Sequence, residues 1–231
     1  MAVVLLAMSA TVVRGETRGD WPPFLAPPAA FSADIVRAVE RVWVAPTLTR
    51  TVRGRSARVP FELYTALMDS PEVTAAAARF LGLARYEVEA LDDDWYRATD
   101  NDGAQGLYRV LAREPTRRVV LSRGEHAGRL LGRIGGSALT VLDFASVDGV
   151  VEPTVTARVR IDNPIAAALA RVLITVFGHI ADRKLAEGFA VTAGVAEWAT
   201  AEPFEFCGWL AQESVPPGRR EPVVTAVGGC L

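Results

Sequence analysis

The chain has 231 residues, of which 50% are hydrophobic, so it is long enough to bury the core of one domain. Its 25 basic and 27 acidic residues leave a net charge of −2, which argues against a nucleic-acid binder, because binding to phosphates requires a basic field. The sequence contains two histidines and no HExxH pattern, so we expect no metal site, and no motif indicates a cofactor.

The chain begins with an apolar run, Met1 to Val13, which is too short to cross a bilayer. Such a run is typical of the hydrophobic region of a secretory signal peptide, and small residues lie near its end at Ala10 and Gly15. We therefore expect residues 1–15 to be a signal peptide and the protein to be secreted or periplasmic. Because no Lys or Arg precedes the run, the alternative is a cytoplasmic protein in which the run is a buried N-terminal strand or follows from a wrongly assigned start.

Residues 16–46 are expected to form a proline-rich arm that ends in a short helix. Four prolines lie in the first half of this segment, which is typical of an extended conformation. Apolar residues then fall at helical spacing from Ser32, a residue type favoured at the N-cap, to Trp43. Pro46 closes the predicted helix.

The next segments predict a strand followed by two helices. Residues 48–59 alternate roughly between polar and apolar side chains, as a strand does. Pro60 and Pro71 each suit the first turn of a helix, and Gly82 suits the end of the second helix.

Residues 85–161 predict an antiparallel sheet with one buried and one solvated face. The clearest strand is 154–161, where Val155, Val159 and Ile161 face one way and the threonine and arginines between them face the other. Short turns separate the strands, which favours antiparallel connections over parallel crossovers. The glycine-rich segment 132–137 is expected to be a hairpin turn.

Residues 162–164 (Asp-Asn-Pro) mark the start of a long amphipathic helix that we expect to continue towards Trp198. Residues 201–231 then predict an irregular C-terminal tail. This tail carries both cysteines, Cys207 and Cys230, whose spacing does not suit a metal site. Two interpretations stand: the cysteines pair and tie down the tail, or they are independent thiols.

The residues from Arg58 to Asp69, with the sequence RVPFELYTALMD, run from a strand into a leucine-rich helix, and a long helix follows the sheet. This order of elements resembles the helix-grip fold of the START-like superfamily, which includes Bet v 1-type proteins and polyketide cyclases. The resemblance covers residues 47–200 and implies an α+β fold. In it, a curved antiparallel sheet wraps around the long C-terminal helix, and a short helix pair follows the first strand.

The same resemblance implies an apolar cavity between the sheet and the long helix. The protein would then bind or transport an apolar small molecule, such as a lipid, sterol, isoprenoid or polyketide-like compound. A core filled solidly by the same side chains is the alternative. Charges along the long helix argue against a membrane span. The candidate ligand-binding residues are Leu121, Leu139, Val141, Val155, Val159, Ile161, Val176, Phe177, His179 and Ile180.

The sequence assigns no catalytic residue. His126 lies beside Glu125, where the pair can do acid–base work, but an exposed loop explains both residues as well. One alternative function is a polyketide cyclase or aromatase-like enzyme, which would need His179, Arg171 or Arg158 to point into the cavity. The other is an envelope interaction protein without a ligand, in which the arm and the tail are docking segments.

Overall fold

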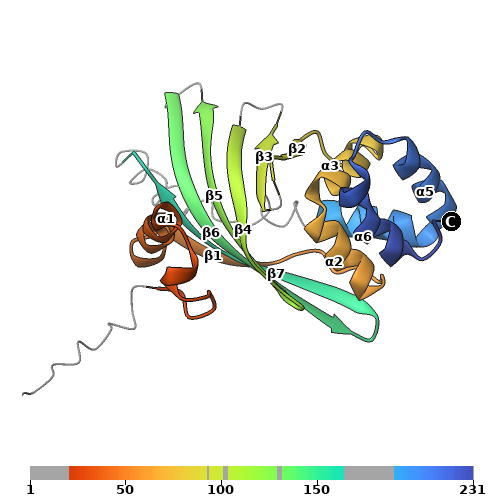
Figure 1. Ribbon diagram of the computed structural model, residues 1–231, viewed down its shortest axis with the longest axis horizontal. Helices are drawn as coiled ribbons and strands as arrows, with labels where there is room; N and C mark the ends of the chain where they lie inside the picture. Colours follow the sequence, from red (N-terminus) through yellow and green to blue (C-terminus); the bar gives the residue numbers. More distant parts are fainter. Residues whose placement is uncertain (1–20, 93, 101–103, 129–131, 164–189, 231) are drawn as a thin grey trace, which may run out of the picture.

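The structure is a computed structural model that describes residues 21–92, 94–100, 104–128, 132–163 and 190–230 (Figure 1). These residues form a seven-stranded antiparallel sheet in the order β1-β7-β6-β5-β4-β3-β2. The predicted α+β fold is confirmed, with a curved sheet and a helix pair after the first strand. The strands are β1 (Leu48–Arg53), β2 (Glu87–Ala90), β3 (Trp95–Thr99), β4 (Ala104–Glu114), β5 (Arg117–Gly128), β6 (Gly132–Val147) and β7 (Val150–Ile161).

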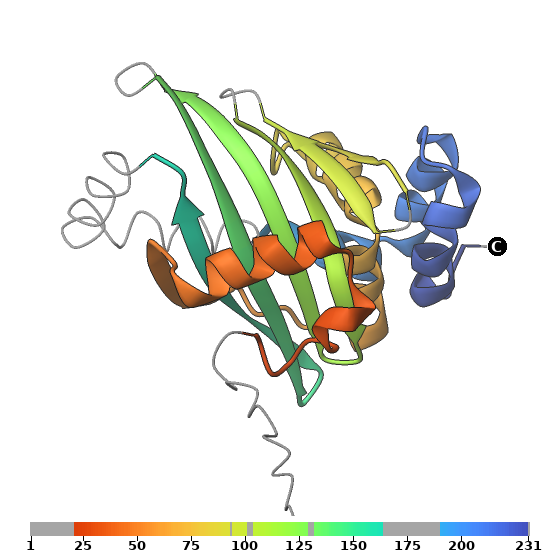
Figure 2. The same ribbon diagram turned by 60° about the vertical axis from the view of Figure 1, so that its left-hand side comes forward.

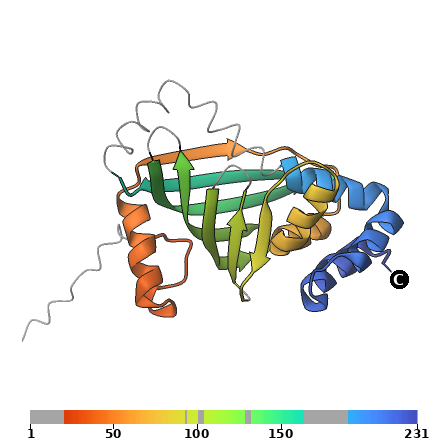
Figure 3. The same ribbon diagram turned by 90° about the horizontal axis from the view of Figure 1, so that it is seen from above.

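Helices lie on both sides of this sheet (Figure 3). Residues 190–201 are also helical, and they are the described part of the predicted long C-terminal helix, whose residues 164–189 lie outside the described chain. Among the described helices, none is both long and apolar enough to cross a membrane. The remaining helices are η1 (Pro28–Ala30), α1 (Ala33–Val44), α2 (Phe61–Asp69), α3 (Pro71–Phe80), α5 (Pro203–Gln212) and α6 (Pro217–Val227).

Helix α1 lies across the strands and covers what we call the outer face of the sheet (Figure 2). It forms where the sequence predicts a helix, because its apolar residues recur at helical spacing and Ser32 occupies the N-cap position. The arm before it also packs here, and Leu25 is buried. The buried residues of this outer cluster are Leu25, Ile35, Val39, Val42, Val119, Leu121 and Leu139.

The opposite, inner face of the sheet meets α2, α3 and residues 190–201. Tyr64 of α2 is fully buried and meets the ring of Phe144 from β6 edge to face, with 5.9 Å between the ring centroids. Val151 and Val155 of β7 are buried in the same cluster. The predicted alternation of β7 is confirmed, because Val155 packs inwards while the Arg158 guanidinium lies over the Trp43 ring on the outer face.

The glycine-rich segment 132–136 is strand β6 and not the hairpin turn that the sequence predicts. It pairs with β5 in an unbroken register, from Gly128 opposite Gly132 to Arg117 opposite Asp143. Glycines suggest a turn when they are judged singly. Here Gly136 lies close to β7, because an added Cβ would come within 2.9 Å of the carbonyl oxygen of Arg160, and this role depends on the partner strand.

The predicted irregular tail is wrong, because residues 203–227 contain two helices. Pro203 and Pro217 each begin a helix at its first position, where the missing N–H costs nothing. Gly228 ends α6 with a φ of 67°, a conformation that favours glycine. Cys207 and Cys230 form a disulfide, which settles the choice that the sequence left open.

Candidate functional site

The inner face of the sheet carries a widely open pocket of about 480 Å³, which we call the first chamber and whose lining includes Asp100, Gln105 and Glu125. Three glycines from adjacent strands lie side by side at its floor. Gly106 on β4 pairs with Gly124 on β5, and Gly124 pairs with Gly136 on β6. A Cβ atom at these positions would come within 2.9 to 3.1 Å of a carbonyl oxygen on the neighbouring strand. The row therefore leaves the middle of the inner face without side chains, and the chamber occupies that space.

A second chamber, of about 340 Å³, lies beside the first, between the sheet and the helices. Tyr86 and Ala98 line both chambers, so the two are contiguous. The lining of the second chamber is predominantly apolar, with tyrosine and threonine hydroxyls as its polar groups. Its walls come from α2, α3, the sheet and residues 190–201, and include Leu67, Val88, Tyr108, Leu142, Val155 and Thr192.

A small polar space of about 120 Å³ adjoins the second chamber. The two share Met68, Pro71, Tyr108 and Leu142. The charged residues that line this small space are Asp69, Arg113 and Arg118. An apolar volume that ends in a few polar groups is the usual composition of a small-molecule site.

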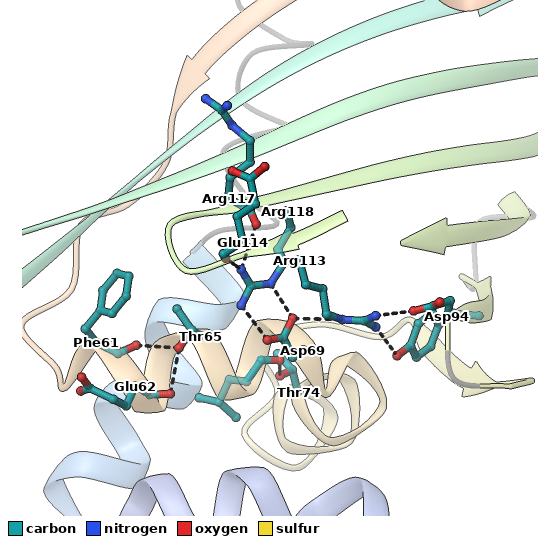
Figure 4. Close-up of polar contacts among 12 residues, drawn as sticks. Phe61, Glu62, Thr65, Asp69, Thr74, Asp94, Arg113, Glu114, Arg117 and Arg118 are labelled. Carbon is teal, nitrogen blue, oxygen red and sulfur yellow. Dashed lines mark hydrogen bonds and ion pairs between the residues drawn. The ribbon is translucent and has the colours of Figure 1, made fainter. Parts of the chain in front are cut away.

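Asp69, the last residue of α2, organises this polar end (Figure 4). Arg118 of β5 donates from Nε and Nη2 to the two carboxylate oxygens of Asp69, at 2.6 and 2.7 Å. Arg113 lies 3.5 Å from the same carboxylate and also pairs with Asp94. The two arginines are thus matched by two carboxylates, and the polar end carries no net charge.

Behind this network lies Glu72, in the first turn of α3. Its side chain is 7% exposed, and no other described residue donates a hydrogen bond to its carboxylate. Burial raises the pKa of this carboxyl, and the backbone N–H of Glu72 itself and Arg219 of α6, 4.0 Å away, partly offset the rise. Arg219 also donates to the hydroxyl of Tyr96 at 3.3 Å, so α6 closes this end of the molecule.

Two of the predicted ligand-binding residues, Val155 and Val159, line the chambers. Ile161 lies opposite Gly136 and shares their inner face. Leu121 and Leu139 pack beneath α1 on the outer face, and Val141, two residues beyond Leu139, shares that face, so the prediction that these three line the same cavity is corrected. The sequence shows two alternating faces per strand but not which face α1 covers. Val176, Phe177, His179 and Ile180 lie outside the described residues.

Sequence reasoning missed several lining residues, among them Ala98, Tyr108 and Thr140. Alternation along β4, where Gly106 and Tyr108 share a face, is the signal that can find Tyr108. Of the polar residues that an enzyme would need in the cavity, Arg158 points away from it, since its guanidinium lies 3.7 Å from the centre of the Trp43 ring. Arg171 and His179 lie outside the described chain. Within the described residues, no group of three or more His, Cys, Asp or Glu side chains can hold a metal ion.

The fold and these chambers define an α+β protein with a curved antiparallel sheet and an apolar volume on its inner face. No protein-family model and no curated protein matches the sequence. Solved structures that resemble the chain include a conserved protein from Geobacillus kaustophilus, with 19% identity over 65% of this chain and 93% of that chain and a TM-score of 0.44. An uncharacterised protein from Rhizobium leguminosarum has 19% identity over 65% of this chain and 94% of its own, with a TM-score of 0.43. Ara h 8.0201 has 11% identity over 64% of this chain and 98% of its own, with a TM-score of 0.38. These likenesses assign no function to the chain.

Proposed function

We propose that this protein binds or carries an apolar small molecule, such as a lipid, sterol, isoprenoid or polyketide-like compound, in the chambers on the inner face of its sheet. The observation that carries the proposal is the pair of contiguous chambers, of about 480 and 340 Å³, joined at Tyr86 and Ala98. Volumes of this size suit a small organic ligand. The element order supports a helix-grip protein of the START-like superfamily.

We propose in addition that the protein works outside the reducing cytoplasm, as a secreted or periplasmic protein. The disulfide between Cys207 and Cys230 supports this location, because disulfides persist in oxidising compartments and are rare in the cytosol. The apolar run at the start of the sequence supports it independently.

Replacing Ala98 by leucine tests the binding proposal. The larger side chain occupies the junction of the two chambers, so a ligand that spans them loses its space. We expect the Ala98→Leu variant to bind the neutral fluorescent probe N-phenyl-1-naphthylamine at least about 10-fold more weakly than the wild type, which corresponds to about 1.4 kcal/mol. Fluorescence titration gives both dissociation constants, and far-ultraviolet circular dichroism checks the fold.

Ala145→Leu is the matched control, because Ala145 lies in β6 of the same sheet but is exposed and lines none of the chambers. This variant should bind the probe as the wild type does. Equal binding by the Ala98→Leu variant would place the probe elsewhere, and no binding by the wild type would contradict the proposed function.

A further inference from the structure

Tyr108 of β4 lies at the boundary between the apolar second chamber and the small polar space, which we call the passage, since it lines both. Its ring stacks on that of Tyr96 in β3, with 5.0 Å between the centroids and 13° between the planes. Tyr96 is itself held in place, because its hydroxyl accepts hydrogen bonds from Arg113 and Arg219 at 3.4 and 3.3 Å. The position of the Tyr108 ring is therefore set by neighbours that are already fixed.

The Tyr108 hydroxyl makes no hydrogen bond to the described residues, although burial raises the pKa of this phenol above its usual value. The group therefore keeps its proton and remains a hydrogen-bond donor throughout the physiological pH range. Tyr108 is half-buried and faces the space that the ligand would occupy. A ligand that supplies an acceptor at this point gains a hydrogen bond from the phenol, whereas a pure hydrocarbon does not.

The charges around the passage argue against an anionic group on the ligand. Arg118 is engaged by both oxygens of Asp69, and Arg113 is engaged by Asp94 and Asp69. A carboxylate on the ligand would have to compete with these carboxylates for the same arginines, and it would lose its hydration on entry. An uncharged acceptor avoids both costs.

We propose that Tyr108 donates a hydrogen bond to a ketone or similar uncharged carbonyl on the ligand, and so selects an apolar molecule that carries one such group near the end that enters the passage. This inference rests on the proposed function, because it names the chemical class of the molecule that the chambers hold. It makes Tyr108 a specificity-determining residue and leaves the apolar walls to supply most of the affinity.

Three probes of nearly the same size test this inference on the full chain: naphthalene, 2-acetylnaphthalene and 2-naphthoate. The wild type should bind 2-acetylnaphthalene about 5-fold more tightly than naphthalene, which is the effect of one neutral hydrogen bond. In the Tyr108→Phe variant this preference should fall below about 2-fold, because phenylalanine keeps the ring and loses the donor. Isothermal titration calorimetry or competition with a fluorescent probe gives the constants.

Tyr64→Phe is the matched control, because the Tyr64 hydroxyl has no hydrogen-bond partner among the described residues but belongs to the solid core and not to the chambers. It should keep the ketone preference. The inference is overturned if Tyr108→Phe keeps that preference, or if the wild type prefers 2-naphthoate to the ketone. Failure of the wild type to bind any of the three probes would instead overturn the proposed function and this inference with it.

Discussion

Replacing Arg118 by methionine is expected to lower the free energy of unfolding by about 2–4 kcal/mol, because it leaves the Asp69 carboxylate without its bidentate partner. The Arg118 side chain is 9% exposed and that of Asp69 is 29% exposed, so the expected loss of unfolding free energy is somewhat smaller than for a fully buried pair. The substitution also removes the donor to the backbone carbonyl oxygens of Glu114 and Arg117. Urea denaturation of both proteins measures the difference.

The adjacent residue provides the control. Arg117 forms an ion pair with Asp143 at 2.6 Å, but the two side chains are 34% and 41% exposed. Solvent screens such a pair, so Arg117→Met should cost less than about 1 kcal/mol. Equal losses in the two variants would show that the Asp69–Arg118 pair does not join α2 to the sheet in the way that Figure 4 shows.

Removing the disulfide is expected to destabilise the protein by about 3 kcal/mol, because a loop closed over a sequence separation of 23 restricts the unfolded chain. The double variant Cys207→Ser, Cys230→Ser and the reduced wild type should show the same loss. Urea denaturation with and without a phosphine reductant measures it. The reductant should leave the double variant unchanged.

The cysteines of the protein isolated from its own cells test the proposed location at the same time. A thiol assay on the unfolded protein should find no free thiol if the chain is exported into an oxidising compartment. Two free thiols per chain, together with equal stability of the wild type and the double variant, would contradict both the stabilising role of the disulfide and the export.

The sequence predicted the elements whose signals are local. Pro60 and Pro71 mark the helix pair, and the alternation from Val155 to Ile161 marks β7 and its two faces. These patterns depend on neighbours within one turn or one strand, which a sequence displays directly. The fold class followed from their order.

The errors fall where the structure depends on distant partners. The prolines of the tail suggest breaks, but Pro203 and Pro217 begin helices that pack on the core, where Phe206 is fully buried. Leu121 and Leu139 are apolar and alternate correctly, yet they face α1, because the choice between the two faces of a sheet is made by the helices that cover them.

The candidate site was predictable only in outline. Val155 and Val159 were identified because β7 alternates clearly, whereas Ala98 and the row of glycines that floors the first chamber carry no signal in a single strand. Their effect arises from the register of β4, β5 and β6, which brings Gly106, Gly124 and Gly136 together. An empty volume is created by small residues in register, and sequence patterns of large residues do not reveal it.

The central claim, that the inner face holds an apolar molecule, is tested most directly by native mass spectrometry of the protein purified from its own host, followed by solvent extraction. We predict one apolar molecule per chain at near-stoichiometric occupancy, and the extract identifies it, with an uncharged carbonyl as its polar group. A mass equal to that of the polypeptide alone, with no uptake from a lipid extract of the host, would contradict the claim.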